Sequence, residues 1–217
     1  MSVTNFLVEE ILRKPASKFI EKHHYSHSTN GVQSIIHYGL FEPDKDNSRF
    51  GVPKMIGAAM YAWPSMPDTG KKYNPINPRK CLELRRFVCI DDTPKNTESY
   101  FLGQTFKMLK RDKDFEVIVS FADEHHGHTA VIYKATNFEY WGKTAGAKML
   151  MVDGKETHSR SLNQVKRPYG RKLKRRYDAG DKNIFWKKTK PKHIYVYYLN
   201  KRIKRKIKKL DFIEKKS

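Results

Sequence analysis

The sequence predicts an α+β fold in which a mixed, mainly antiparallel sheet is flanked by helices. Short runs rich in Val, Ile and aromatic residues, separated by turns containing Pro, Gly and Asp, alternate with segments of helical periodicity. Hydrophobic residues make up 38% of the 217 residues, which is enough to build a full core. A basic segment near the C-terminus is expected to form an insertion and a tail on this fold.

The N-terminal third predicts one helix and two strands. Apolar residues recur at helical spacing in residues 5–22, and Pro15 is expected to break or kink this helix. A polar loop at residues 23–30 carries His23, His24 and His27. Strands are expected at 35–41 and 55–63, followed by a proline-rich loop.

The middle of the chain predicts a central strand at residues 81–90, with a bulge or twist near Arg85 and Arg86. A helix is expected at 98–111, capped by Asn96 or Thr97. The remaining elements are a strand at 115–121, a helix at 128–141 ended by Gly142, and strands at 148–152 and 193–199.

The positive charge is concentrated in the last third of the chain. The net charge is +21, and residues 151–217 hold 23 Lys and Arg against 6 Asp and Glu, a net +17. Such an excess calls for a polyanion, and nucleic acid is favoured over a membrane surface. The residues expected to contact phosphates are Lys166, Arg167, Arg171, Lys172, Lys174, Arg175 and Arg176.

We expect one domain at residues 1–200, which includes the basic insertion at 160–183, and a basic tail at 201–217. In this tail, Ile203, Ile207 and Leu210 share one helical face. That face could lie on an acidic bilayer or pack on the core, or the segment could follow phosphates.

Two cysteines, Cys81 and Cys89, lie eight residues apart in one predicted strand. A fully extended segment of that length spans about 27 Å, so the two thiols cannot form a disulfide within it. Because the sequence also shows no signal peptide or long apolar span, a cytoplasmic protein is expected. Two isolated cysteines disfavour a zinc ribbon and the zinc-deaminase pattern.

The richest chemical segment is residues 120–138, SFADEHHGHTAVIYKATNF. Asp123 follows a buried strand and is the first candidate for a general base or a metal ligand, with helix capping as the alternative. Tyr133 could donate a hydrogen bond or stack on a base, or be a buried structural tyrosine. His125, His126 and His128 surround Asp123, although histidine-rich loops are often only solvated.

The order of elements resembles the GNAT acyltransferase fold, and several segments resemble the bacteriophage Mom family more narrowly. These segments are HHYSHS at 23–28, ELRRFVC at 83–89, NTESYFLGQTFKMLK at 96–110 and the segment at 120–138. The resemblance implies transfer of a carbamoylmethyl group to N6 of adenine in double-stranded DNA. It implies a phage protein that acts in the host cytoplasm and protects phage DNA from restriction.

Further site residues are expected on this basis. Arg85 is a candidate catalytic group, with a structural pair to Glu83 as the alternative. Ser99 could contact a donor or substrate, although a Ser in the first turn of a helix is most often structural. The resemblance also raises iron(II) as a cofactor, with His24, His27 and Asp123 as the favoured ligands of a facial triad.

Acetyl-CoA is disfavoured as the cofactor, and the group donor is unknown. The turn at 91–99 has no glycine and opens with two carboxylates, whereas GNAT enzymes bind pyrophosphate on a glycine-rich turn. The absence of a glycine-rich S-adenosylmethionine turn and of an Asn/Asp-Pro-Pro-Tyr motif disfavours a methyltransferase.

The target base must leave the duplex stack, and aromatic side chains can offset that cost. The candidates are Tyr25, Tyr38, Tyr61, Trp63 and Tyr133, with half-buried structural aromatics of strands and helices as the alternative. Two other functions stay open: a GNAT-type acyltransferase that acts on a protein or small amine, and a basic nucleic-acid-binding protein without catalysis.

Overall fold

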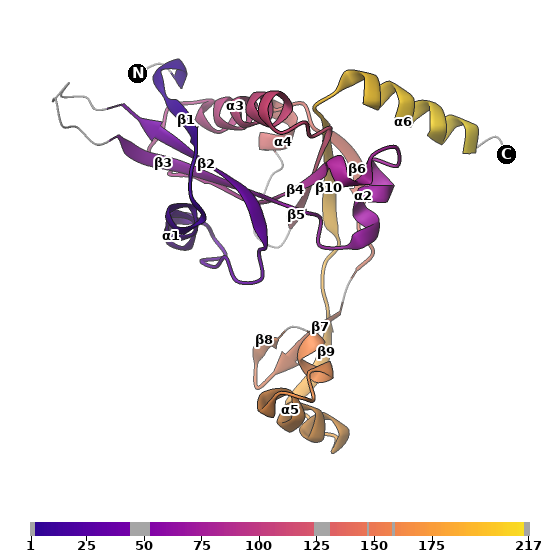
Figure 1. Ribbon diagram of the computed structural model, residues 1–217. Helices are drawn as coiled ribbons and strands as arrows, with labels where there is room; N and C mark the ends of the chain where they lie inside the picture. Colours follow the sequence, from indigo (N-terminus) through magenta and orange to yellow (C-terminus); the bar gives the residue numbers. More distant parts are fainter. Residues whose placement is uncertain (1–2, 44–52, 124–130, 147, 158, 215–217) are drawn as a thin grey trace. The chain divides into compact units, whose positions relative to one another are not determined.

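The computed structural model describes residues 3–43, 53–123, 131–146, 148–157 and 159–214. The chain divides into two compact units (Figure 1). Unit 1 comprises Met1–Ala122, His128–Gly142 and Ile194–Ser217, and unit 2 comprises Asp123–Gly127 and Lys143–His193. Unit 2 therefore extends beyond both ends of the basic insertion expected at 160–183. No described helix is long and apolar enough to cross a bilayer.

Unit 1 is built on a seven-stranded sheet in the order β1-β2-β3-β4-β5-β10-β6. The strands β1 to β4 pair antiparallel, and β4 pairs parallel with β5. The strands are β1 Leu7–Glu10, β2 Ser34–Glu42, β3 Lys54–Ala62, β4 Cys81–Cys89, β5 Val117–Asp123, β6 Glu139–Lys143 and β10 Lys192–Tyr198. The expectation of a mixed, mainly antiparallel sheet with flanking helices is confirmed.

Helices cover both faces of this sheet (Figure 1). On one face, Phe101 and Leu102 of α3 pack with Tyr61, Leu82 and Ile118. On the other, Ala16 and Ile20 of α1 pack against Ala58 and Met60. The helices of unit 1 are α1 Arg13–His23, α2 Pro67–Tyr73, α3 Thr97–Asp112, α4 Val131–Ala135 and α6 Lys201–Glu214, with short 3-10 turns η1 Val3–Asn5 and η2 Pro78–Lys80.

The N-terminal helix expected at residues 5–22 is shorter than expected and follows a strand. Residues 7–10 pair with Tyr38–Phe41 of β2, so tertiary pairing overrides the helical periodicity there. Pro15 does not break α1, because it lies in the first turn, where a missing N–H costs no helical hydrogen bond. The proline-rich loop also contains a helix, α2, which begins at Pro67.

The helix expected at 128–141 is also wrong in extent. Helix α4 ends at Ala135, and Asn137 adopts a left-handed conformation with φ 60°. The N–H of Phe138 donates to the carbonyl of Tyr133 at 2.9 Å, which closes the helix in a Schellman-type turn. The chain then enters strand β6, so residues 139–141 are extended. Residues 124–130, which include Gly127 and the expected helix start, lie outside the described residues.

Unit 2 has a separate small core. Its three-stranded antiparallel sheet has the order β8-β7-β9, formed by β7 Lys148–Val152, β8 Lys155–Thr157 and β9 Ile184–Lys188. The 3-10 turn η4 Ser159–Asn163 and helix α5 Pro168–Asp178 complete it. The core residues are Leu150, Val152, Leu162, Leu173 and Ile184.

Candidate active site and nucleic-acid interface

Strands β4 and β5 separate partway along their length. They pair in parallel only at Cys81–Val117, Leu82–Ile118 and Glu83–Val119 among the described residues. In the β3–β4 register, Met60 pairs with Arg86 and Tyr61 pairs with Leu84, so Arg85 is the extra residue of a bulge. The bulge expected near Arg85 and Arg86 is thus confirmed. It bends β4 where the two strands part, and a separation of strands inside a sheet leaves backbone groups available to a ligand.

Tyr133 projects from α4 to this separation. Its hydroxyl lies 3.0 Å from Oγ of the buried Ser120, and Ser120 Oγ donates to the Leu84 carbonyl at 3.3 Å. With the serine proton directed to Leu84, Tyr133 is the donor to Ser120. A hydrogen-bonded chain therefore links β4, β5 and α4 at the point where the strands diverge.

Aromatic rings fix the position of Tyr133. Its ring stacks on Tyr195 of β10 at a centroid distance of 4.2 Å and an interplanar angle of 3°, and meets Phe138 edge-on at 5.3 Å. Burial raises the pKa of Tyr133 above its usual value, and the hydrogen bond with Ser120 opposes part of that rise. The phenol is therefore protonated at neutral pH and suits hydrogen bonding rather than proton abstraction.

Arg86 and Tyr25 approach the same region, although sequence reasoning did not select Arg86. Arg86 Nε donates to the Ser28 carbonyl at 3.2 Å, and Nη1 donates to the Arg85 carbonyl at 2.8 Å. Burial lowers the pKa of Arg86, and Tyr25 is near enough to affect the pKa values of both Arg86 and Tyr133. Tyr25 is 44% exposed, so its ring is accessible to a ligand at this site.

Arg85 and Ser99 are held by local contacts. Arg85 Nη1 donates to Glu83 Oε1 at 2.7 Å and also to Ser65 Oγ, so the expected structural pair with Glu83 is present. Ser99, in the first turn of α3, donates to the Asn96 carbonyl at 3.0 Å. Neither side chain is hydrogen-bonded to Tyr133 within the part of the chain that the structure describes.

Asp123 is the last residue of β5, three residues after Ser120. Its side chain lies outside the described residues, as do His125, His126 and His128. Among the aromatic candidates, Tyr38 and Tyr61 are fully buried in the core and cannot stack on a base, which corrects that expectation. Trp63 is exposed and packs edge-on against Phe115 at 5.7 Å.

The two expected histidine ligands differ in their hydrogen bonding. The Ser26 backbone N–H donates to His24 Nδ1 at 3.1 Å, so the proton of neutral His24 resides on Nε2, and neither nitrogen suits a metal. His27 Nδ1 faces the Glu21 carbonyl at 3.1 Å and must donate to it, which leaves the Nε2 lone pair for a ligand. The described residues contain no cluster of three metal-ligating side chains. The triad of His24, His27 and Asp123 stays a prediction, because the Asp123 side chain lies outside the described residues.

The turn between β4 and α3 lines a cavity of about 270 Å³. Asn96 adopts the left-handed conformation with φ 72°, which glycine adopts most readily. The Thr97 N–H already donates to the Pro94 carbonyl at 3.2 Å, and Asp91 lines the cavity. The Asp91 carboxylate and the occupied Thr97 N–H disfavour a pyrophosphate here, whereas Lys95 lines the same cavity and supplies a positive charge for an anion.

Unit 2 carries all seven of the expected phosphate-contacting residues on or beside α5. Its Lys143–His193 segment holds 16 Lys and Arg against 4 Asp and Glu, a net +12. Of the seven expected phosphate contacts, five are exposed and make no salt bridge with a described residue: Lys166, Arg167, Arg171, Lys172 and Arg175.

Lys174 and Arg176 are engaged within unit 2. Lys174 pairs with Asp178 one turn along α5. Arg176 donates to both oxygens of Asp153, at 2.9 and 2.6 Å, and to Asp181 at 2.7 Å. Arg176 therefore joins α5 to the turns that follow β7 and α5.

Comparisons with known proteins define the class of fold first. The structure superposes on the spermidine/spermine N-acetyltransferase from Vibrio cholerae with a TM-score of 0.50 and 8% identity, over 94% of this chain and 98% of that chain. An acetyltransferase of the GNAT family from Streptococcus pneumoniae gives a TM-score of 0.48 and 9% identity, over 89% of this chain and 99% of that chain. The fold is that of the GNAT acetyltransferases.

The sequence comparison then gives the family. The model of the Mom protein family matches residues 5–216, and the chain belongs to this family. A methylcarbamoylase from Escherichia phage Mu is 25% identical over 210 residues, covering 92% of this chain and 78% of that protein. The expected resemblance is confirmed.

Proposed function

We propose that this protein transfers a carbamoylmethyl group to N6 of adenine in double-stranded DNA. The observation that carries the proposal is the half-buried Tyr133–Ser120 pair at the divergence of β4 and β5, in a chain that matches the Mom family from residue 5 to residue 216. The similarity to the phage methylcarbamoylase supports the reaction type.

The reaction sets the roles of the residues. The N6 lone pair is delocalised into the adenine ring, so its attack on the donor carbon needs a base for the N6 proton. In our proposal Asp123 accepts this proton, the new C–N bond forms, and the leaving group departs with its electron pair. In our proposal Tyr133 keeps its proton in the hydrogen bond to Ser120, so its hydroxyl oxygen accepts a hydrogen bond from the N6 amino group, and Tyr25 stacks on the everted base.

In our proposal Arg86 takes the catalytic role that the sequence suggested for Arg85. The Arg86 guanidinium is half-buried between the 24–33 loop and β4, whereas Arg85 is paired with Glu83. A cation at that position stabilises negative charge on the donor or leaving group. Ser99 keeps a structural role at the start of α3.

The basic residues of unit 2 supply the DNA contact in this proposal. The exposed cations on or near α5 contact phosphates and position the duplex without selecting a sequence. Modified adenine would then be hidden from restriction enzymes, and the reaction would take place in the host cytoplasm on phage DNA.

Expression of the intact protein in a bacterial host tests the proposal. Genomic DNA is digested to nucleosides, and mass spectrometry is expected to show a heavier deoxyadenosine. Tyr133→Phe keeps the ring stack and removes the hydroxyl, so it should reduce the modified fraction, and Asp123→Ala should abolish it while DNA binding persists. Tyr38→Phe is the matched control, because it also removes a buried tyrosine hydroxyl but lies in the core.

One outcome would reject the proposed reaction, and another would reject the role of Tyr133 in it. Unmodified DNA in several hosts that express folded protein would favour an acyltransferase acting on a protein or small amine, or a binding protein without catalysis. Full activity of Tyr133→Phe would show that the Tyr133 hydroxyl has no role in the reaction. Retention of DNA binding by inactive variants separates a catalytic defect from a binding defect.

A further inference from the structure

A groove of about 560 Å³ lies in unit 1 where the middle of α3 meets the end of β10 and the start of α6. An aromatic pair lines it, because Phe106 stacks on Tyr197 at a centroid distance of 4.4 Å. Four cations surround this pair: Lys107 and Lys110 from α3, and Lys201 and Arg202 from α6. The described residues that line the groove include no Asp or Glu.

The four cations of this groove have no acidic partner among the described residues, unlike their neighbours. On or next to the same two helices, Arg111 pairs with Asp112, Lys113 with Glu10 and Lys204 with Glu139. Lys107, Lys110, Lys201 and Arg202 are all exposed and form no salt bridge within the described part of the chain. Positive charge without a partner in a groove is a feature of anion-binding surfaces.

The start of α6 is fixed in place. Asn200 Oδ1 accepts the Arg202 N–H at 2.9 Å, and the Asn200 carbonyl accepts the Lys204 N–H at 3.1 Å. Lys201 and Arg202 are therefore held in the first turn of a capped 14-residue helix, where the helix dipole also favours an anion.

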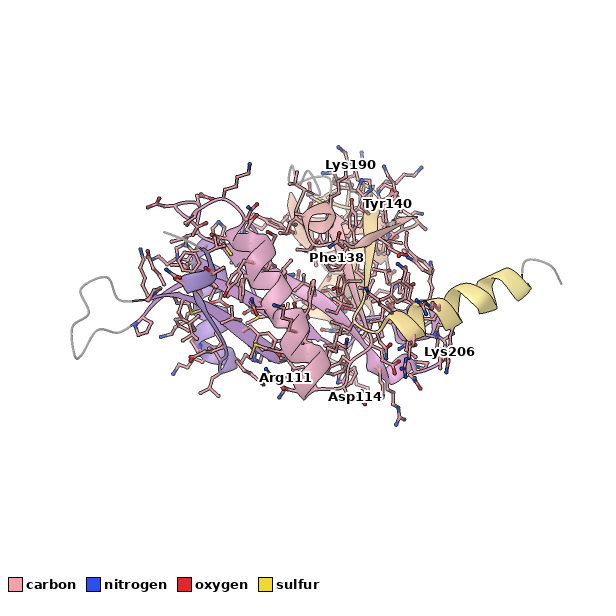
Figure 2. The ribbon with its side chains drawn as sticks, turned by 90° about the horizontal axis from the view of Figure 1, so that it is seen from above. Arg111, Asp114, Phe138, Tyr140, Lys190 and Lys206 are labelled. Atoms are coloured by element: carbon pink, nitrogen blue, oxygen red, sulfur yellow. The ribbon has the colours of Figure 1, made fainter. Side chains whose placement is uncertain are left out.

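The first two turns of the apolar face of α6 are covered, and the Leu210 side chain lies outside the described residues. Ile203 and Ile207 are 7% and 1% exposed and pack with Ile194, Val196 and Tyr198. Of the three roles expected for this segment, packing on the core is thus observed, and these two isoleucines are not available to a bilayer. The remaining surface of its first turns is cationic and includes Arg205 and Lys206, the latter labelled in Figure 2.

We propose that this groove binds the phosphodiester backbone of double-stranded DNA, as a contact separate from the cations of α5. The inference rests on the proposed function and extends it to the unit that carries Tyr133. Cations spread over two helices suit successive phosphates along a strand better than they suit a single small anion. Contacts of this kind hold the duplex on unit 1 without reading its sequence.

The test measures the salt dependence of binding between the full-length protein and a double-stranded oligonucleotide. Lys107→Gln/Lys110→Gln removes two groove cations, and the slope of log K against log salt should fall in magnitude by about 1.8. Affinity at 0.1 M salt should fall by up to about 60-fold. Lys201→Gln/Arg202→Gln is a second variant from the other helix and should behave in the same way.

The matched control is Lys14→Gln/Lys18→Gln, which removes two exposed charges from α1 on the opposite face of the sheet. Its slope should equal that of the wild type. Thermal midpoints equal to wild type show that each variant is folded. An unchanged salt slope in both groove variants, or an equal fall of the slope in the control, would overturn the proposal that this groove binds DNA. Failure of the wild-type protein to bind DNA would instead reject the proposed function.

Discussion

Two adjacent arginines of α5 offer a sharp test of the proposed DNA interface, because the structure places them in different environments. Arg175 is exposed and makes no salt bridge with a described residue, whereas Arg176 bonds to Asp153 and Asp181. We therefore expect Arg175→Gln to weaken DNA binding and Arg176→Gln to weaken unit 2 itself. The two substitutions remove the same charge from neighbouring positions.

The magnitude for Arg175 follows from counterion release. One lost phosphate contact lowers the magnitude of the salt slope by about 0.9, which corresponds to about eightfold in affinity at 0.1 M salt. The assay is a titration of a fluorescent duplex at several salt concentrations. Hydrogen exchange of the α5 amides in the same samples reports the stability of unit 2, which should be unchanged in Arg175→Gln.

Arg176→Gln should show the reverse pattern. Loss of the guanidinium leaves the carboxylates of Asp153 and Asp181 without their cation, so the α5 amides should exchange faster. The salt slope should stay within error of the wild type at temperatures where unit 2 is folded. A lowered slope in Arg176→Gln together with unchanged exchange would refute the reasoning, because it would make Arg176 the phosphate contact.

Three further predictions concern stability. Gly170→Ala should destabilise unit 2 by about 1–3 kcal/mol in chemical denaturation, because a Cβ there would lie 2.3 Å from the Gln164 carbonyl oxygen. Gly103→Ala is the contrasting variant: its Cβ would meet open space, so it should stabilise α3 by about 0.5–1 kcal/mol. Tyr38→Phe should be neutral or stabilising by about 1 kcal/mol, since the Tyr38 hydroxyl is buried without a partner among the described residues; a loss of stability would indicate a bound water. The destabilisation by Arg176→Gln should vanish in acid: Arg176 lowers the pKa of Asp153, and the Asn183 N–H and Arg176 lower that of Asp181. Their contribution is therefore present above the unfolded pKa of about 3.9 and is lost as pH falls through the folded values, which thermal melts from pH 6 to pH 2 would show.

The sequence predicted the strands of unit 1 better than its helices. Strands β2, β3, β4 and β10 were each expected within about one residue of their observed bounds, because buried central strands have continuous runs of apolar residues. Strand β1 has only four residues and is defined by its pairing with β2, which local periodicity does not encode. The end of α4 depends on the left-handed Asn137, a single residue whose conformation no apolar pattern signals.

The candidate site was predicted in part. Tyr133 and the bulge of β4 were expected from the sequence, but the pairing of Tyr133 with Ser120 depends on three elements meeting. Arg86 was not selected because the sequence predicts a bulge near Arg85 and Arg86 but does not tell which of the two is the extra residue. That choice decides which face of the sheet each arginine side chain lies on. The one available signal was that Arg85 already had Glu83 as a partner two residues away.

The distribution of charge explains how a GNAT fold can serve a polymeric substrate. A small acyl donor is held by the N–H groups of one turn, and here that turn carries carboxylates and no glycine. A duplex offers many phosphates far from the reacting atom, so its binding energy can come from cations on separate elements such as α5 and α6. Binding energy from these remote contacts can offset the cost of everting a base. The residues at the β4–β5 divergence then need only contact the everted base and its reaction partner. If this is correct, removal of α5 cations should lower activity on long duplexes more than on short single strands, where eversion costs little. Equal losses of activity on both substrates would mean that these cations contribute to the chemical step rather than to the binding of duplex DNA.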